Sequence, residues 1–273
     1  MLLKSYICPR NKRRRVLAVL PARYESTRFP GKPLVPIAGV PMVVRTYRRA
    51  AAALLVDAVV VATDDERVAA VCREAGARVV MTPAECPNGT ERCRAAAAAL
   101  ERAGERYDVV VNVQGDEPLI EPEVIDAVVA ALRAAPEAVQ STAATPIRDL
   151  RDVAMTQRVK CVLDQQDNAI YFSRGALPSN KEGVARKFPQ PWADKPYLLH
   201  LGIQCYDRRF LDRYCEMEPT PLMMMEDLEQ LKVIENGYKI KVVQVEHSAH
   251  GVDLPEDVAS IEAILRQQEA AQP

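Results

Sequence analysis

The chain has 273 residues, of which 48% are hydrophobic and 27% are charged. This composition excludes a disordered, collagen-like or coiled-coil protein, and the length suits one large α/β domain or two small ones. The net charge of -1 gives no general reason to expect a polyanionic partner such as nucleic acid. The seven cysteines lack CxxC spacing, which argues against a disulfide framework or a zinc site and favours a reducing compartment.

The first fifteen residues are strongly basic, with lysines and arginines and no acid. They are too short and too basic for a signal-peptide core, and no apolar run approaches the roughly 18–20 residues that cross a bilayer. We predict a solvated basic tail over residues 1–15. The alternative is the charged flank of an upstream anchor or transit sequence, and only then do we expect membrane association.

Short apolar runs alternate with helix-like stretches through the first half of the chain. The predicted strands are rich in valine and lack polar alternation, which is typical of strands buried on both faces; they are residues 16–20, 58–62, 78–81 and 109–113. The predicted helices, rich in alanine, arginine and glutamate, are residues 41–55, 65–76 and 90–104. This alternation predicts a doubly wound, mostly parallel α/β sheet with right-handed crossovers, a Rossmann-like fold.

The second half is more mixed. Its predicted strands are residues 160–164, 169–173, 197–206 and 239–246, and its predicted helices are residues 225–237 and 254–268. Residues 179–196 are polar and rich in proline, which predicts a long functional loop with Trp192 as a candidate lid anchor. We expect a single domain over residues 16–268 that includes a small β-rich lobe, roughly 140–222, followed by a short tail at 269–273.

A basic loop follows the first predicted strand directly. Arg23, Arg28 and Lys32 lie there with Gly31, at the carboxyl end of a strand, where open α/β sheets bind ligands. Arginine gives forked hydrogen bonds and lysine a compact charge, so three such cations suit a triphosphate. The sequence is not a Walker A loop, and an ordinary basic surface loop remains the alternative.

Two carboxylates are candidates for a magnesium site. Asp116 follows the fourth predicted strand and Asp253 stands beside a glycine in GVDLPED. Mg²⁺ usually takes one or two protein carboxylates together with substrate phosphates. A helix-capping turn is the alternative at Asp116, and an ordinary helix start is the alternative at Asp253. Together, the basic loop and the two acids suggest phosphoryl or nucleotidyl transfer.

A set of segments distributed along the chain resembles the CMP-Kdo synthetase family, the 3-deoxy-manno-octulosonate cytidylyltransferases, and most closely its plant and algal branch. The resemblance covers roughly residues 16–268 and depends on the whole set. The segments are RYESTRFPGKPL, VATDDERV, NGTERC, VNVQGDEPLIEP, AIYFSR, LLHLGI, EDLEQLK and HGVDLPEDV. It implies transfer of CMP from CTP to the anomeric hydroxyl of Kdo, release of pyrophosphate, a requirement for Mg²⁺, and a homodimer whose β-rich lobe serves dimerisation and sugar binding.

The resemblance also implies roles for individual residues. Lys32, Arg28, Asp116 and Asp253 would be catalytic, with the two aspartates as the metal pair. The nucleotide site would comprise Arg23, Arg28, Lys32, Asn88, Gly89, Thr90 and Arg92. The sugar site would comprise Gln114, Tyr171, Ser173, Arg174, His200, Gln204, Glu229 and Gln230. Without the resemblance, His200 suggests a satisfied strand histidine, and Glu229 and Gln230 suggest the solvated face of a helix.

Three positions depart from the family pattern. Gln204 and Asp207 stand where bacterial members usually have tyrosine and arginine, and Lys232 replaces the usual arginine after LEQL. These departures leave the exact sugar acid open more than the reaction. The alternatives are therefore cytidylyl transfer to amino-Kdo or a sialic acid, and a non-catalytic nucleotide-binding regulator. We expect a cytoplasmic location, or an organellar, mitochondrial one for a plant-type member, and no nucleic-acid role for Arg13, Arg14 and Arg15.

Overall fold

The structure, a computed structural model, describes residues 14–25, 29–179, 197–247, 251–252 and 254–270. Contacts divide the described chain into two compact units. The first unit comprises residues up to 126 together with those from 251 onward, and the second comprises residues 127–247. The predicted β-rich lobe falls within the second unit, while the single-domain boundaries remain a prediction. Most of the basic tail and the loop with Trp192 lie outside the described residues.

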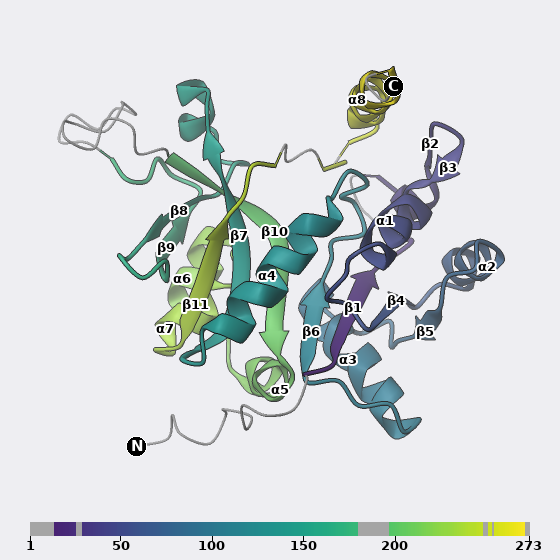
Figure 1. The fold of residues 1–273 in the computed structure, drawn as a ribbon, viewed down its shortest axis with the longest axis horizontal. Helices are drawn as coiled ribbons and strands as arrows, with labels where there is room; N and C mark the ends of the chain where they lie inside the picture. Colours follow the sequence, from purple (N-terminus) through teal and green to yellow (C-terminus); the bar gives the residue numbers. More distant parts are fainter. Residues whose placement is uncertain (1–13, 26–28, 180–196, 248–250, 253, 271–273) are drawn as a thin grey trace. The chain divides into compact units, whose positions relative to one another are not determined.

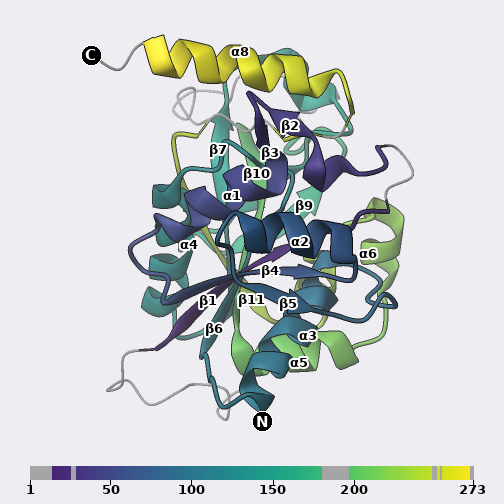
Figure 2. The same cartoon turned by 90° about the vertical axis from the view of Figure 1, so that its right-hand side faces the viewer.

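The first unit is built on a parallel sheet of four strands. In spatial order these are β6 (Val109–Asn112), β1 (Val16–Pro21), β4 (Ala58–Thr63) and β5 (Val79–Met81). Helices α1 (Met42–Ala51) and α2 (Glu66–Glu74) cover one face of this sheet, and α3 (Gly89–Arg102) covers the other (Figure 2). The doubly wound α/β prediction is therefore confirmed, and each predicted strand and helix of this half lies within a few residues of its expected place.

Four further elements belong to the first unit (Figure 1). A short 3-10 helix, η2 (Lys32–Leu34), precedes the hairpin of β2 (Pro36–Ile37) and β3 (Val40–Pro41). The C-terminal helix α8 (Asp257–Ala270) packs on that hairpin, because its Ile261 and Leu265 share one apolar cluster with Ile37. The predicted helix at 254–268 thus exists but begins three residues later.

The second unit contains a mixed sheet. Strand β7 (Ala138–Ile147) pairs in parallel with β11 (Lys239–Gln244) and antiparallel with β10 (Tyr197–Asp207). Strand β8 (Lys160–Leu163) pairs antiparallel with both β10 and β9 (Ala169–Ser173). The sequence analysis did not identify β7, α5 (Arg208–Glu216) or η3 (Leu150–Ala154), nor α4 (Pro122–Ala134), which contains the boundary between the two units.

The helix predicted over residues 225–237 is wrong in the middle. The chain instead forms α6 (Pro221–Glu226) and α7 (Leu231–Glu235), and Asp227 between them has a positive φ of 52°. The Arg174 guanidinium accounts for the break, since it donates to the backbone oxygens of Glu226 (2.6 Å) and Asp227 (3.1 Å). Those two carbonyls would otherwise accept bonds from the next helical turn.

Candidate functional site

Lys32 lies at the C-terminal end of the basic loop and is the first residue of η2, where the backbone conformation fixes its position. Gly31 adopts a left-handed conformation (φ 71°) and its N–H donates to the Tyr24 carbonyl, which closes the loop in front of η2. The Lys32 ammonium donates to Asp116 Oδ2 at 2.6 Å and to the Val252 carbonyl at 2.9 Å. Residues distant in sequence therefore meet at one cation, while the predicted roles of Lys32 in phosphate binding and of Asp116 in metal binding stay predictions.

The chain after β6 approaches β1 very closely. A Cβ atom at Gly115 would lie 2.9 Å from the Pro21 carbonyl oxygen, which leaves room for glycine alone. The Gly115 carbonyl accepts from the Thr46 hydroxyl of α1 at 3.2 Å, and the Asp116 carbonyl accepts from the Val252 N–H at 3.0 Å. The Asp116 carboxylate is thus fixed at the sheet edge with its side chain 33% exposed.

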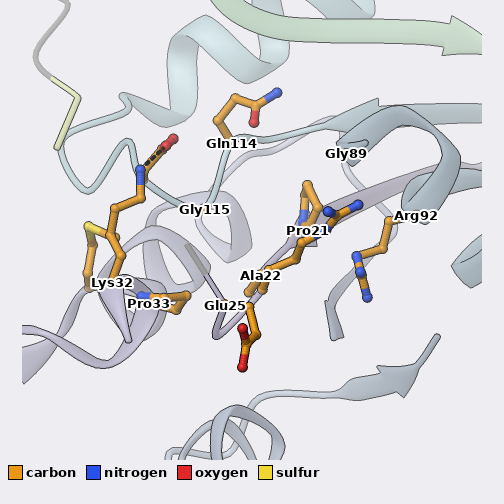
Figure 3. Close-up of a pocket in the computed structure, with 12 residues that line it drawn as sticks. Pro21, Ala22, Glu25, Lys32, Pro33, Gly89, Arg92, Gln114 and Gly115 are labelled. Carbon is orange, nitrogen blue, oxygen red and sulfur yellow. Dashed lines mark hydrogen bonds and ion pairs between the residues drawn. The ribbon is translucent and has the colours of Figure 1, made fainter. Parts of the chain in front are cut away.

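A cavity of about 230 Å³ opens between the basic loop, the start of α3 and the end of β6 (Figure 3). Six of the predicted site residues line it, namely Arg23, Lys32, Gly89, Arg92, Gln114 and Asp116. The other lining residues are Pro21, Ala22, Glu25, Pro33, Met42 and Gly115. Arg28 and Asp253 lie outside the described residues, so their predicted roles stay predictions.

Two guanidinium groups at this cavity have nitrogen donors without a partner in the described part of the chain. Arg92 is fully buried and donates to Thr82 Oγ1 at 2.7 Å and to Asp64 Oδ2 at 3.3 Å. Its Nε, and one terminal nitrogen of Arg23, are buried without a hydrogen bond to any described residue. A buried donor is costly unless a partner arrives. Both donors therefore favour a ligand rich in acceptors, such as a nucleoside triphosphate.

Helix α3 begins at the cavity wall as predicted. Asn88 is its N-cap and accepts from the Glu91 N–H at 2.8 Å, while Gly89 is the first helical residue and lies against Pro21. Thr90 is fully buried inside the unit. The N-terminal end of a helix carries partial positive charge and free N–H groups, so it adds to the attraction for an anion or a polar base.

In the second unit, Glu226 joins two of the predicted sugar-site residues. It accepts from the Ser173 hydroxyl at 2.7 Å and from the Arg174 N–H at 2.8 Å. The buried Lys160 ammonium donates to the carbonyls of Arg174, Met155 and Arg158, and burial lowers its pKa. Burial, helped by the negative charge of Glu226, raises the pKa of Tyr171 in the same strand.

His200 lies in β10 with its ring held on two sides. Its Nε2 is 2.8 Å from Thr142 Oγ1, and its ring meets Phe172 edge-on with centroids 4.8 Å apart. Burial lowers the pKa of His200 to about 4, so the imidazole is neutral at physiological pH.

Gln230 lies in the turn between α6 and α7 and is 3% exposed. Its Nε2 is buried without a hydrogen-bond partner among the described residues. The neighbouring Glu229 carbonyl accepts from the Tyr214 hydroxyl at 3.2 Å. An unpartnered buried amide next to a carboxylate is suited to a polar ligand, and it lies in a turn where the sequence analysis expected a helix.

The three departures from the family pattern are all engaged within the protein. Gln204 is 7% exposed and its Oε1 accepts from Gln140 Nε2 at 3.1 Å and from the Tyr206 hydroxyl. Asp207 is the N-cap of α5. The Lys232 ammonium lies 3.9 Å from the centre of the Tyr214 ring, a cation–π contact. These contacts give each residue a structural role, and the sugar-binding role of Gln204 stays a prediction.

Sequence reasoning missed Glu226, Thr142 and Thr82. Each forms a hydrogen bond with a predicted site residue: Glu226 with Ser173 and Arg174, Thr142 with His200, and Thr82 with Arg92. Glu226 stands at the head of the quoted EDLEQLK segment, so its place in a motif was the available signal. Thr142 and Thr82 carried no signal, because isolated threonines near strands are common.

Known proteins resemble this chain over most of its length. The model of the cytidylyltransferase family matches residues 17–240. The mitochondrial 3-deoxy-manno-octulosonate cytidylyltransferase of Arabidopsis thaliana is 56% identical over 93% of this chain and 84% of its own length. The enzyme of the same name from Protochlamydia amoebophila is 42% identical over 93% and 95%.

A solved structure supports the same assignment. The structure of CMP:2-keto-3-deoxy-manno-octonic acid synthetase complexed with CTP matches with a TM-score of 0.82 and 32% identity, over 93% of this chain and 99% of that one. No helix among the described residues is long and apolar enough to cross a membrane. The chain belongs to the cytidylyltransferase family and, within it, to the 3-deoxy-manno-octulosonate cytidylyltransferases, which are nucleotidyltransferase enzymes.

Proposed function

We propose that the protein transfers CMP from CTP to the anomeric hydroxyl of Kdo and releases pyrophosphate. The observation that carries the nucleotide half is the cavity, where Arg23 and Arg92 each keep an unpartnered buried donor beside the Lys32 ammonium. Membership of the family supports the acceptor, because the relatives are named for 3-deoxy-manno-octulosonate.

Residues of the chain would bind and orient the substrates of such a reaction. The sugar hydroxyl oxygen would attack the α-phosphorus, the bond from that phosphorus to the bridging oxygen would break to release pyrophosphate, and the hydroxyl proton would pass to solvent water. Arg23, Arg28 and Lys32 would bind the triphosphate, and Lys32 and Arg28 would offset charge on the departing pyrophosphate. Because the nucleophile belongs to the substrate, no serine, cysteine or histidine nucleophile is required.

The residues at the cavity fit a magnesium ion held together with the nucleotide. Asp116 supplies a partly exposed carboxylate at the cavity wall. The Asp116 carbonyl also accepts a hydrogen bond from the Val252 N–H, and Val252 directly precedes Asp253 in the sequence. Mg²⁺ usually takes one or two protein carboxylates together with substrate phosphates, so a single carboxylate pair would be enough to hold it. When bound, the ion would polarise the α-phosphate and lower the pKa of the attacking hydroxyl.

The sugar acid would contact polar groups of the second unit. Gln230 has an unpartnered buried amide, and Ser173 and Arg174 are fixed by Glu226. Amino-Kdo and sialic acids remain as alternative acceptors, since they also carry a carboxylate and several hydroxyls. We also propose that the protein forms the homodimer that the family resemblance implies. The mitochondrial name of the Arabidopsis relative supports a mitochondrial location over a cytoplasmic one.

The first test is pyrophosphate release with each nucleotide and each sugar acid, with and without Mg²⁺. We expect CTP to be preferred over ATP and GTP by at least about tenfold, roughly 1.4 kcal/mol of discrimination. Kdo should be used in preference to amino-Kdo or a sialic acid. Equal turnover with GTP would overturn the cytidylyl assignment, and faster turnover with another sugar acid would overturn Kdo.

The second test concerns the proposed metal pair. Asp116→Asn and Asp253→Asn should each lower turnover by on the order of 10²–10³, the loss typical of one contact made to transition-state charge. The double variant should lose much less than the two losses combined if both acids hold one ion. Pyrophosphate release across a magnesium titration measures this, with thermal melts as the folding control. Strictly independent losses would contradict a shared metal.

A further inference from the structure

The hydroxyl of Thr142 lies at an irregularity in the pairing of β7 with β10. The register of these strands shifts between His200 and Gln204, which turns carbonyl oxygens of the intervening residues toward Thr142. The hydroxyl oxygen is 2.6 Å from the Ile203 carbonyl, 3.4 Å from the Leu201 carbonyl and 2.8 Å from His200 Nε2. Thr142 is fully buried, so water does not compete for these contacts.

The positions of the protons follow from counting donors. A carbonyl oxygen can only accept, and a threonine hydroxyl has a single proton to give. At 2.6 Å the contact with Ile203 requires that proton, since two oxygens without a hydrogen between them would repel each other. The hydroxyl therefore has only lone pairs to offer to His200, and the imidazole must donate from Nε2.

We propose that Thr142 is a positioning residue that fixes His200 as the Nε2–H tautomer, so that Nδ1 presents an acceptor to a hydroxyl of the sugar acid. The proposal deepens the proposed function and depends on it for the identity of the ligand. Among the described residues, the contact with Thr142 at Nε2 is the hydrogen bond that the His200 ring makes. The edge-on contact with Phe172 fixes the plane of the ring, and therefore the direction of this lone pair.

The tautomer of His200 determines which groups of a ligand its Nδ1 atom can bind. A neutral ring that already donates through Nε2 can accept at Nδ1, but it cannot donate to a carboxylate or a phosphate there. Burial, which lowers the pKa of His200 to about 4, keeps the second proton off the ring near neutral pH. His200 would thus recognise a hydroxyl of the ligand rather than its acid group.

The tautomer can be measured directly in the full-length protein without any ligand. The chain has three histidines, so nitrogen NMR of histidine-labelled protein can be assigned by comparison with His200→Gln. We expect a protonated Nε2 and an unprotonated Nδ1 in the wild type and in Thr142→Ser, which keeps the hydroxyl. In Thr142→Val, which keeps the shape and loses the hydroxyl, we expect a mixture of tautomers.

The kinetic test uses the same pair of variants. Thr142→Val should raise KM for Kdo by about tenfold, the effect of one misdirected hydrogen bond, while KM for CTP changes by less than about threefold. Thr142→Ser should stay within about threefold of the wild type for both substrates. Addition of Kdo to the wild type should shift the Nδ1 resonance, because that nitrogen then accepts a hydrogen bond.

A wild-type spectrum with the proton on Nδ1 would overturn the proposal, as would a Thr142→Val protein whose tautomer is unchanged. If Thr142→Val does not fold, the wild-type and Thr142→Ser spectra still decide the tautomer. Failure of the proposed function would look different. The wild type would then not turn over Kdo at all, while the ligand-free spectra would still show whether Thr142 sets the tautomer.

Discussion

The role of a single polar side chain in this protein depends on the partners that lie within its reach in the fold. Gln204 and Asp207 show the limit of sequence analysis at this scale. Both differ from the usual family residues, which drew attention to sugar specificity, yet Gln204 is buried against Gln140 and Asp207 caps α5. A sequence identifies the residue type, but whether its polar atoms face a ligand or a neighbouring strand depends on contacts across the fold.

The buried histidine gives a prediction at the residue scale. Between pH 6.5 and about 4 the unfolded chain protonates His200 while the folded protein does not, because burial lowers the folded pKa. The unfolded state then binds more protons, so stability should fall as pH falls through this window. We expect His200 to contribute about 1–3 kcal/mol to this loss, less than the full shift implies because the residue as a whole is intermediate in burial.

The measurement is the free energy of unfolding against pH for the wild type and His200→Gln. The variant should lose less stability between pH 6.5 and about 4, and the two curves should run parallel above pH 7. Curves that stay parallel throughout the acid range would show that the folded protein protonates His200 as readily as the unfolded chain does.

At the scale of elements, β7 shows why one strand escaped sequence analysis. Its residues 138–147 are small and polar, without the valine-rich signature that predicted the parallel strands. Gln140, Ser141 and Thr142 are nevertheless fully buried, and the Gln140 amide nitrogen and the two hydroxyls donate hydrogen bonds to partners on neighbouring elements. Such partners are distant in sequence, so no local pattern could indicate that these polar residues belong to a core strand.

In contrast to β7, the proximity of the basic loop to the end of β6 could be predicted, because it follows from the topology of a parallel sheet. In a parallel sheet the carboxyl ends of neighbouring strands share one edge, so residues that follow β1 and β6 must meet. Arg23, Lys32, Gln114 and Asp116 do meet at one cavity. Gly115 and Pro21 also approach each other closely at this edge of the sheet, and this contact leads to a prediction for Gly115.

Gly115→Ala should damage the site, because its new Cβ would lie 2.9 Å from the Pro21 carbonyl oxygen and must displace the chain that carries Asp116. We expect a loss of about 1–3 kcal/mol in stability and at least about tenfold in kcat/KM. Gly251→Ala is the matched control, since its Cβ would make an ordinary 3.7 Å contact with the Asp116 carbonyl. Equal activity of the two variants would contradict a tight approach at Gly115.

At the scale of the whole molecule, the path of the chain matters more than any motif. After completing the second unit, residues from 251 onward belong to the first unit. There the Val252 carbonyl accepts from Lys32, and α8 joins the cluster around Ile37 and Met42. Strand–helix alternation predicts a parallel sheet but does not state which unit a late helix completes, because that depends on long-range apolar contacts.

Because the chain returns to the first unit, α8 is part of the support for the cavity that we propose binds the nucleotide. Ile261 is 1% exposed and packs with Met42, which lines the cavity, and with Val252, which accepts from Lys32. Ile261→Ala should therefore lower stability by about 2–4 kcal/mol. We also expect KM for CTP to rise by about three- to tenfold, because the walls that hold Lys32 and Met42 would relax.

Thermal melts and CTP titrations test this helix against Ile170→Ala, the same substitution at a position of β9 that is 55% exposed. The control should change stability by less than about 0.5 kcal/mol and leave KM for CTP unaltered, as expected of an exposed site remote from special features. If Ile261→Ala is destabilised but keeps a normal KM for CTP, α8 only packs against the unit and does not support the cavity. If neither quantity changes, the apolar cluster beneath α8 is not formed in solution.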